Sequence, residues 1–107
     1  MLTKDELPEC PVATTIQLIG NKWKLLIIRN LLHKTSRFNE LRREVPGISQ
    51  KVLTENLKSL EKDGLIDRRV YAEVPLRVEY SLSEVGNSLR GIIKHMESWG
   101  IEYKKRI

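Results

Sequence analysis

Residues 46–64, with the sequence PGISQKVLTENLKSLEKDG, contain the strongest fold signal in the chain. A Pro-Gly turn signal opens the stretch, and Ser49 is a residue type that caps helix N-termini. Leucines then recur at helical spacing, as Leu53, Leu57 and Leu60. Gly64 can take the left-handed conformation that ends a helix. The pattern therefore predicts a helix over residues 50–63 with one apolar face.

The face of this predicted helix opposite the leucines is polar. Its residues fall at i, i+1, i+4, i+5 and i+8, as Gln50, Lys51, Thr54, Glu55 and Lys58. An amide can pair with adenine, an ammonium group can reach guanine or phosphate, and a threonine offers a hydroxyl and a methyl group. Such a stripe is typical of a helix that reads DNA bases, although an ordinary solvated helix face has a similar composition. Its position directly after the Pro-Gly turn favours the DNA-reading interpretation.

Three shorter helices are predicted upstream. Pro11 can occupy the first turn of a helix that ends at Gly20. Asn21 is a candidate N-cap for a second helix running to about His33, and Asn39 for a brief third helix closed by the Pro-Gly turn. The second helix is expected to bury a wide face formed by Trp23, Leu26, Ile27, Asn30 and Leu31.

Downstream of Gly64 the period of the pattern changes. Residues 66–71 are rich in β-formers, and apolar and polar residues alternate strictly over 77–82, which predicts two strands with one buried face on the second. The intervening residues 72–76 must turn the chain back. Ser83 then starts a last helix of about 20 residues, some 30 Å long, part of which is expected to leave the domain.

Helix, helix, short helix, tight turn, helix, β-hairpin and long helix is the order of a winged helix-turn-helix. The predicted fold is therefore mainly α with a small β-hairpin and a long terminal helix that serves dimerisation. With 107 residues there is room for one domain, which we expect over residues 10–107 after an N-terminal arm over residues 1–9.

Net charge and composition limit the binding partners, the cellular location and the cofactors that the sequence allows. Nineteen Lys and Arg residues against fourteen Asp and Glu residues give a net charge of +5, which favours polyanions, although many basic proteins bind none. No apolar stretch approaches the ~20 residues of a membrane span, and the first residues lack a signal-peptide core, so a cytoplasmic protein is expected. A single cysteine, Cys10, excludes an intrachain disulfide, and His33 and His95 lack matching ligands, so we expect neither a metal site nor a cofactor.

Several short runs of the chain occur together in one known protein family. They are WK at 23–24, RFNEL at 37–41, GISQKVL at 47–53, LK at 57–58, GLI at 64–66 and VEYSL at 78–82. In combination they resemble the HxlR family, a branch of the MarR-like winged-helix regulators. The resemblance implies a homodimer that binds a palindromic operator in double-stranded DNA and regulates transcription. Within this family-level expectation we predict a repressor.

The resemblance also implies roles for individual residues. Ser49, Gln50, Lys51, Thr54 and Lys58 would lie on the recognition helix. Arg37 would stand near the DNA backbone and Arg77 in the wing, as the hairpin is called. Arg68 is a further candidate, because cations beside a recognition helix can follow the backbone or enter the minor groove. Glu73 and Glu79 could pair with the hairpin arginines instead.

The first and last helices carry more apolar surface than the predicted core needs. The residues concerned are Ile16, Ile92, Met96, Trp99 and Tyr103. Packing two copies about a two-fold axis would bury them and set two recognition helices about 34 Å apart, as a palindromic site requires. Alternatively, the last helix folds back over its own domain.

Cys10 lies at the start of the first predicted helix. The positive helix end and Lys22 or Lys24 would favour a reactive thiolate, whereas Glu6 and Glu9 would disfavour it. The family resemblance implies a possible sensor of oxidants or electrophiles at this residue, acting through an adduct or a disulfide between chains. The alternative is a small residue that packs the start of the helix.

Two other classes of function fit the sequence less well. An enzyme is not expected, because the chain has no glycine-rich phosphate loop, no histidine in a nucleophile arrangement and no isolated carboxylate pair; only a thiol-dependent enzyme at Cys10 is formally open. A winged-helix module that docks proteins is the second alternative. Neither the operator nor any small-molecule effector can be read from the sequence.

Overall fold

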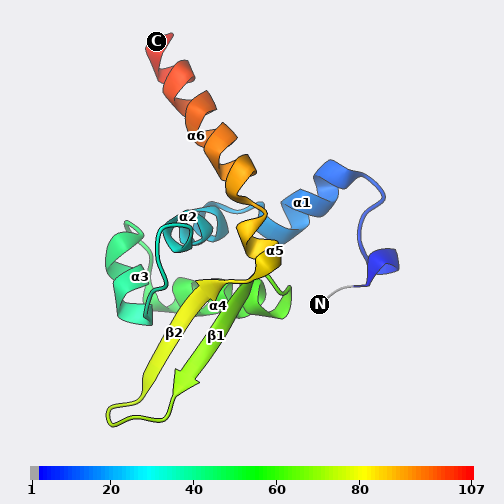
Figure 1. The fold of residues 1–107 in the computed structure, drawn as a ribbon. Helices are drawn as coiled ribbons and strands as arrows, with labels where there is room; N and C mark the ends of the chain where they lie inside the picture. Colours follow the sequence, from blue (N-terminus) through cyan, green and yellow to red (C-terminus); the bar gives the residue numbers. More distant parts are fainter. Residues whose placement is uncertain (1–2) are drawn as a thin grey trace.

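The computed structural model describes residues 3–107 (Figure 1). Its elements, in order, are η1 (Lys4–Glu6), α1 (Pro11–Ile19), α2 (Lys22–Leu31), α3 (Phe38–Glu44), α4 (Gln50–Lys62), β1 (Ile66–Tyr71), β2 (Arg77–Leu82), α5 (Glu84–Asn87) and α6 (Arg90–Lys105). The β1–β2 hairpin extends from one side of the helical body, and α6 leaves it on the opposite side (Figure 1). The predicted winged helix-turn-helix, mainly α with one small hairpin and a protruding terminal helix, is confirmed. The first two residues of the expected N-terminal arm lie outside the described part.

Local capping signals act where the sequence predicts them. The Ser49 hydroxyl accepts a hydrogen bond from the Val52 N–H at 3.2 Å, and the Asn21 side chain accepts one from the Lys24 N–H at 2.8 Å. Gly47 and Gly64 have φ values of 78° and 75°, a region in which a Cβ atom would be strained. The N-terminus of α4 is therefore held by its own sequence, which fixes where its polar face begins.

The core lies between α2, α4 and the base of the hairpin. Its largest fully buried side chains are Ile27, Ile28, Leu41, Leu53, Leu57, Leu60, Val45 and Ile66. Each such aliphatic side chain contributes about 1.5–3 kcal/mol relative to an exposed one. The leucine stripe of α4 is thus buried as predicted, which turns the opposite, polar face of α4 outward.

The predicted buried face of α2 was only partly right. Trp23, Leu26 and Asn30 are half-buried, whereas Ile28 and Lys24 are buried. The reason is that α2 packs against α3, α4, α6 and β2, so it is covered on more than one side. Helical periodicity describes a helix with a single covered face, and α2 is more central than that.

The hairpin is antiparallel, with Ile66 opposite Leu82 and Arg68 opposite Tyr80. Tyr80 is buried, but the alternate residues of β2 are half-buried rather than exposed, which corrects the expectation of a single buried face. On that second face Arg77 lies over the Tyr71 ring and pairs with Glu79. Side chains of the hairpin therefore cover the second face in part.

The last helix differs from the prediction, because it is broken. The Ser83 hydroxyl accepts from the Gly86 N–H at 3.0 Å, as a cap should, but α5 ends at Asn87 and α6 starts at Arg90. The Leu89 N–H bonds three residues back, to the Gly86 carbonyl, which tightens the turn. Gly86 and Asn87 are weak helix formers, and α5 lies so close to the Leu65 carbonyl that only glycine fits. The terminal helix α6 is therefore about 24 Å long rather than 30 Å.

Two helix ends also differ. Helix α2 ends at Leu31 and not at His33. Helix α3 begins at Phe38, with Arg37 in the N-cap position instead of Asn39, because the Glu40 carboxylate accepts the Arg37 N–H at 3.0 Å. This bond starts the helix two residues earlier than the Asn39 signal predicts, and it places Arg37 at the helix end.

Candidate nucleic-acid interface

The polar side chains on the outward face of α4 differ in solvent exposure and in the hydrogen bonds they already make. Gln50, Lys51 and Lys58 are exposed, and Ser49 is exposed with its oxygen used in the cap. Thr54 is half-buried and donates its hydroxyl to the Gln50 carbonyl at 2.9 Å. The side chains of Gln50, Lys51 and Lys58 are therefore free to form new hydrogen bonds, whereas Thr54 offers chiefly its methyl group.

A hollow of about 480 Å³ separates α4 from the hairpin. Gln50, Thr54 and Lys58 line it from α4, and Arg68 lines it from β1. These are four of the residues that the sequence singled out, brought together from two elements. Glu61 is the carboxylate on the same wall, so the hollow carries a net positive charge. Lys51 faces solvent outside this hollow.

A second, larger hollow of about 670 Å³ lies between α3 and the hairpin. It is lined by two of the predicted DNA-binding residues, Arg37 and Arg77. It is also lined by Arg43, which the sequence analysis did not predict. Asn39 and Arg43 are four residues apart on one face of α3, but the opposite wall comes from β2 and the preceding loop. Because that wall is distant in sequence, no local pattern could have indicated Arg43.

Arg77 forms ion pairs and a cation–π contact with other residues of the hairpin. Its guanidinium lies 3.1 Å from the Glu73 carboxylate, 3.8 Å from that of Glu79, and 3.8 Å from the centre of the Tyr71 ring. Its Nε atom is buried and has no hydrogen-bond partner among residues 3–107. The pairing that the sequence left open as an alternative is thus present, and it neutralises part of the charge of Arg77. By contrast, no ion pair within residues 3–107 includes Arg37, Arg68, Lys51 or Lys58.

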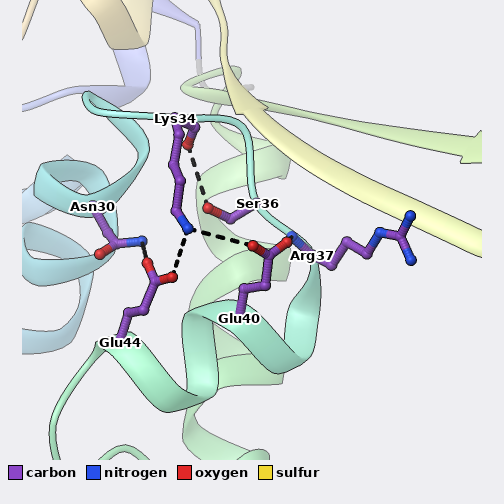
Figure 2. Close-up of polar contacts among 6 residues, drawn as sticks. All are labelled: Asn30, Lys34, Ser36, Arg37, Glu40 and Glu44. Carbon is purple, nitrogen blue, oxygen red and sulfur yellow. Dashed lines mark hydrogen bonds and ion pairs between the residues drawn. The ribbon is translucent and has the colours of Figure 1, made fainter.

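The start of α3 is fixed by a polar cluster around Lys34 (Figure 2). The Lys34 Nζ atom lies 2.7 Å from the Glu44 carboxylate and 3.4 Å from that of Glu40, and Asn30 donates to Glu44 at 2.8 Å. Figure 2 shows the Arg37 side chain extending away from this cluster. The carboxylates of Glu40 and Glu44 therefore have their partners within the cluster, and the Arg37 guanidinium lies outside it.

The same contacts shift the ionisation of the cluster. The Lys34 ammonium group, and then the Asn30 amide, lower the pKa of Glu44. The Arg37 N–H, and then Lys34, lower the pKa of Glu40. Glu44 and then Glu40 raise the pKa of Lys34. All three groups are consequently charged across the neutral range, which keeps the cluster intact there.

The residues predicted to form a dimer interface are all exposed. On α6, Ile92, Met96, Trp99 and Tyr103 recur at helical spacing and are 41%, 48%, 69% and 50% exposed, and Ile16 on α1 is 60% exposed. The Trp99 and Tyr103 rings stack, with their centres 5.3 Å apart. Since α6 points away from the body (Figure 1), it does not fold back over its own domain.

Cys10 is exposed and directly precedes the first turn of α1. Its side chain makes no capping hydrogen bond. Of the two lysines expected near it, Lys24 is buried, and Lys22 lies 4.6 Å from the centre of the Trp23 ring. An exposed thiol is open to solvent reagents, unlike the packed cysteine that was the alternative expectation.

Among residues 3–107 there is no group of three or more His, Cys, Asp or Glu side chains that could hold a metal ion. No helix in that range is long and apolar enough to cross a membrane.

Comparison with known sequences shows one family. Residues 18–107 match the model of the HxlR-like helix-turn-helix family. The HTH-type transcriptional regulator YdeP of Bacillus subtilis (strain 168) is 48% identical over 105 residues, which are 98% of this chain and 82% of YdeP.

Solved structures agree with this. The redox regulator HypR in its oxidised form is 45% identical, with a TM-score of 0.83 over 87% of this chain and 96% of HypR. A regulator assigned to the MarR family, from Porphyromonas gingivalis W83, is 41% identical, with a TM-score of 0.84 over 95% of this chain and 97% of its own. The winged fold and its MarR-like character are therefore shared with known regulators.

Proposed function

Since the chain belongs to the HxlR-like helix-turn-helix family of DNA-binding transcriptional regulators, we propose that it binds a palindromic operator as a homodimer and represses transcription. The family resemblance expected from the sequence is confirmed, and the family is one of regulators and not of enzymes. Repression would follow from occupation of a promoter-proximal site that excludes polymerase. Such a protein would work in the cytoplasm, beside the genome.

The observation that carries the proposal is the hollow beside the recognition helix. It gathers Gln50, Thr54 and Lys58 of α4 with Arg68 of β1, and neither cation is held in an ion pair within the described chain. An amide next to unpaired cations suits a base edge flanked by phosphates.

We assign the contacts accordingly. Helix α4 enters the major groove with Ser49, Gln50, Lys51, Thr54 and Lys58, while Arg37, Arg68 and Arg77 hold the backbone. Arg77 would have to share its charge between DNA and its two acidic partners, so we expect it to contribute less than Arg37. Residues 10–107 would form the DNA-binding domain and residues 1–9 an arm.

The dimer is proposed from exposed apolar surface. The side chains of Ile92, Met96, Trp99 and Tyr103 form one stripe on a helix that extends from the body, and Ile16 on α1 is a further exposed apolar side chain. A second copy is the occupant that a two-fold palindromic site requires, because it supplies the second recognition helix.

Thiol sensing through Cys10 is the finer part of the proposal. It is supported by the exposure of Cys10 and by the similarity to HypR, a redox regulator. Oxidation by diamide would join two Cys10 thiols of different chains, or one thiol and a small thiol. Two protons and two electrons would pass to diamide as the S–S bond forms.

The test is selection of genomic duplex fragments by the purified protein, followed by salt titration of the fragments recovered. We expect a palindromic motif, and an affinity that falls with salt with a slope of about −0.9 per phosphate contact. Failure to enrich any fragment over random DNA at low salt would overturn the proposal and favour a protein-docking module.

A further inference from the structure

The hollow between α3 and the hairpin has two walls. Arg37 and Arg43 line it from α3, and Leu76, Arg77 and Val78 line it from the hairpin. Both α3 arginines are exposed, and the hollow is open to solvent. At about 670 Å³ it is large enough to admit a segment of a polymer backbone and not only a side chain.

The balance of charge in this hollow favours an anion. Among the described residues that line it, Glu40 is the one acid, and its carboxylate lies 3.4 Å from the Lys34 Nζ atom and accepts the Arg37 N–H at 3.0 Å. Arg77 shares its charge with two acids of the hairpin. Within residues 3–107 no ion pair includes Arg37 or Arg43, so these two guanidinium groups supply the unneutralised charge.

The hollow adjoins the recognition surface. Phe38 lines it and also lines the hollow that holds Gln50, Thr54 and Lys58 of α4. A helix seated in the major groove, about 12 Å wide, has a phosphate backbone on each side. The backbone on the α3 side would then run past the mouth of this second hollow.

We infer that Arg43 binds the DNA backbone in this hollow, together with Arg37, as a phosphate contact independent of base sequence. This inference rests on the proposed function. A guanidinium fork matches the geometry of a phosphate and can bind it through two hydrogen bonds. Arg43 would therefore set the position of the duplex against α3 and would not select its sequence.

The neighbouring residue provides a matched control. Arg42 is also exposed and also lies in the last turn of α3, but it does not line the hollow. Arg42→Ala and Arg43→Ala change the net charge and the helix composition equally. Only a local contact can make them differ in DNA binding.

The experiment compares the full chain, Arg42→Ala, Arg43→Ala and Arg43→Lys on the selected operator and on a random duplex of equal length, across a series of salt concentrations. Each protomer of the dimer loses one contact in Arg43→Ala, so the variant should weaken binding of both duplexes about 25-fold at 0.15 M salt and reduce the salt slope by about 1.8, as expected for two phosphates. Arg43→Lys should keep the slope, because it keeps the charge. Arg42→Ala should keep both slope and affinity.

The outcomes separate the two claims. Equal slopes for Arg42→Ala and Arg43→Ala, with normal binding by the unmodified protein, would overturn the Arg43 contact and leave the proposed function intact. A loss confined to the operator would contradict a backbone contact and indicate base reading. Absence of salt-dependent duplex binding by the unmodified protein would overturn both. Thermal unfolding of each variant checks that the fold is retained.

Discussion

Ser36 and Tyr80 exchange both of their backbone hydrogen bonds, with Ser36 donating at 3.0 Å and Tyr80 at 2.8 Å. This antiparallel bridge joins the connection between α2 and α3 to strand β2. Arg37 follows Ser36 directly, and Arg77 lies on the same strand as Tyr80. The bridge therefore fixes the two walls of the α3–hairpin hollow relative to each other, near the base of the hairpin.

Gln50→Ala should relax base preference at one operator position in each half-site. The amide is exposed on α4, and a well-formed side-chain contact to a base discriminates by about 1–3 kcal/mol. Repeating the fragment selection with the variant measures the effect. Binding to random duplex should change little, and an unaltered motif would remove Gln50 from the base-reading residues.

Trp99→Glu should shift the protein from dimer to monomer. A charge would be placed in the apolar stripe of α6, where Trp99 stacks on Tyr103. Sedimentation at several protein concentrations measures the shift, and operator affinity should fall with it. Lys94→Glu, an exposed change on α6 away from the stripe, is the control. A monomeric unmodified protein would contradict the proposed interface.

The Lys34 cluster should make stability depend on pH at both extremes. The pKa values of Glu40 and Glu44 are lowered from an ordinary 4.5, so their contribution is present above 4.5 and is lost as the pH falls through the lowered values. The pKa of Lys34 is raised from 10.5, so its contribution is present below 10.5 and is lost as the pH rises through the raised value.

The variant Lys34→Met tests this assignment. The fall in its free energy of unfolding at acid pH should become smaller but should not vanish, because Glu40 still accepts the Arg37 N–H. The fall at alkaline pH should lose the contribution of Lys34. Urea unfolding at a series of pH values gives the profile. Lys105→Met, which breaks the exposed pair with Glu102, is the control and should leave the profile as it is. An identical profile for Lys34→Met would refute the role of the cluster.

Gly86→Ala should destabilise the fold by about 1–3 kcal/mol, because the new Cβ would lie 2.0 Å from the Leu65 carbonyl oxygen. Gly91→Ala is the matched control, since no atom of the described part of the chain would lie within 4 Å of the added Cβ. It should be neutral or stabilise α6 by about 0.5 kcal/mol. Denaturant midpoints measure both, and equal midpoints would show that the contact between α5 and Leu65 yields easily.

Diamide should weaken operator binding only while Cys10 is present. The exposed thiol can then form a disulfide with a second chain, which would appear as a doubled mass on a non-reducing gel. Cys10→Ser should bind the operator like the reduced protein and ignore diamide. If oxidation forms the disulfide but leaves affinity unchanged, Cys10 is not a switch for DNA binding.

Much of the fold follows from local patterns. The caps at Asn21, Ser49 and Ser83, the leucine stripe of α4 and the two strands are signals within a few residues of one another, and all stand where predicted. The outward, polar face of α4 could be predicted for the same reason, because the buried stripe of a helix dictates which face remains outside.

The order of the elements, the winged fold and the polar face of α4 could be predicted from the sequence, since helical and strand periods and capping residues act over short distances. The folded structure was needed to show that the last helix breaks before Arg90, that α3 starts at Phe38, and that Arg77 is shared with two acids. It was also needed to show that Arg37 and Arg43 on α3 line one hollow with Arg77 on the opposite side. The helix break and the hollow depend on groups supplied by distant parts of the chain, namely the Leu65 carbonyl beside Gly86 and the β2 residues opposite α3. The start of α3 and the Arg77 pairs use acids within four residues, but the folded backbone decides which of the competing local partners is taken. Local periodicity carries no information about such contacts.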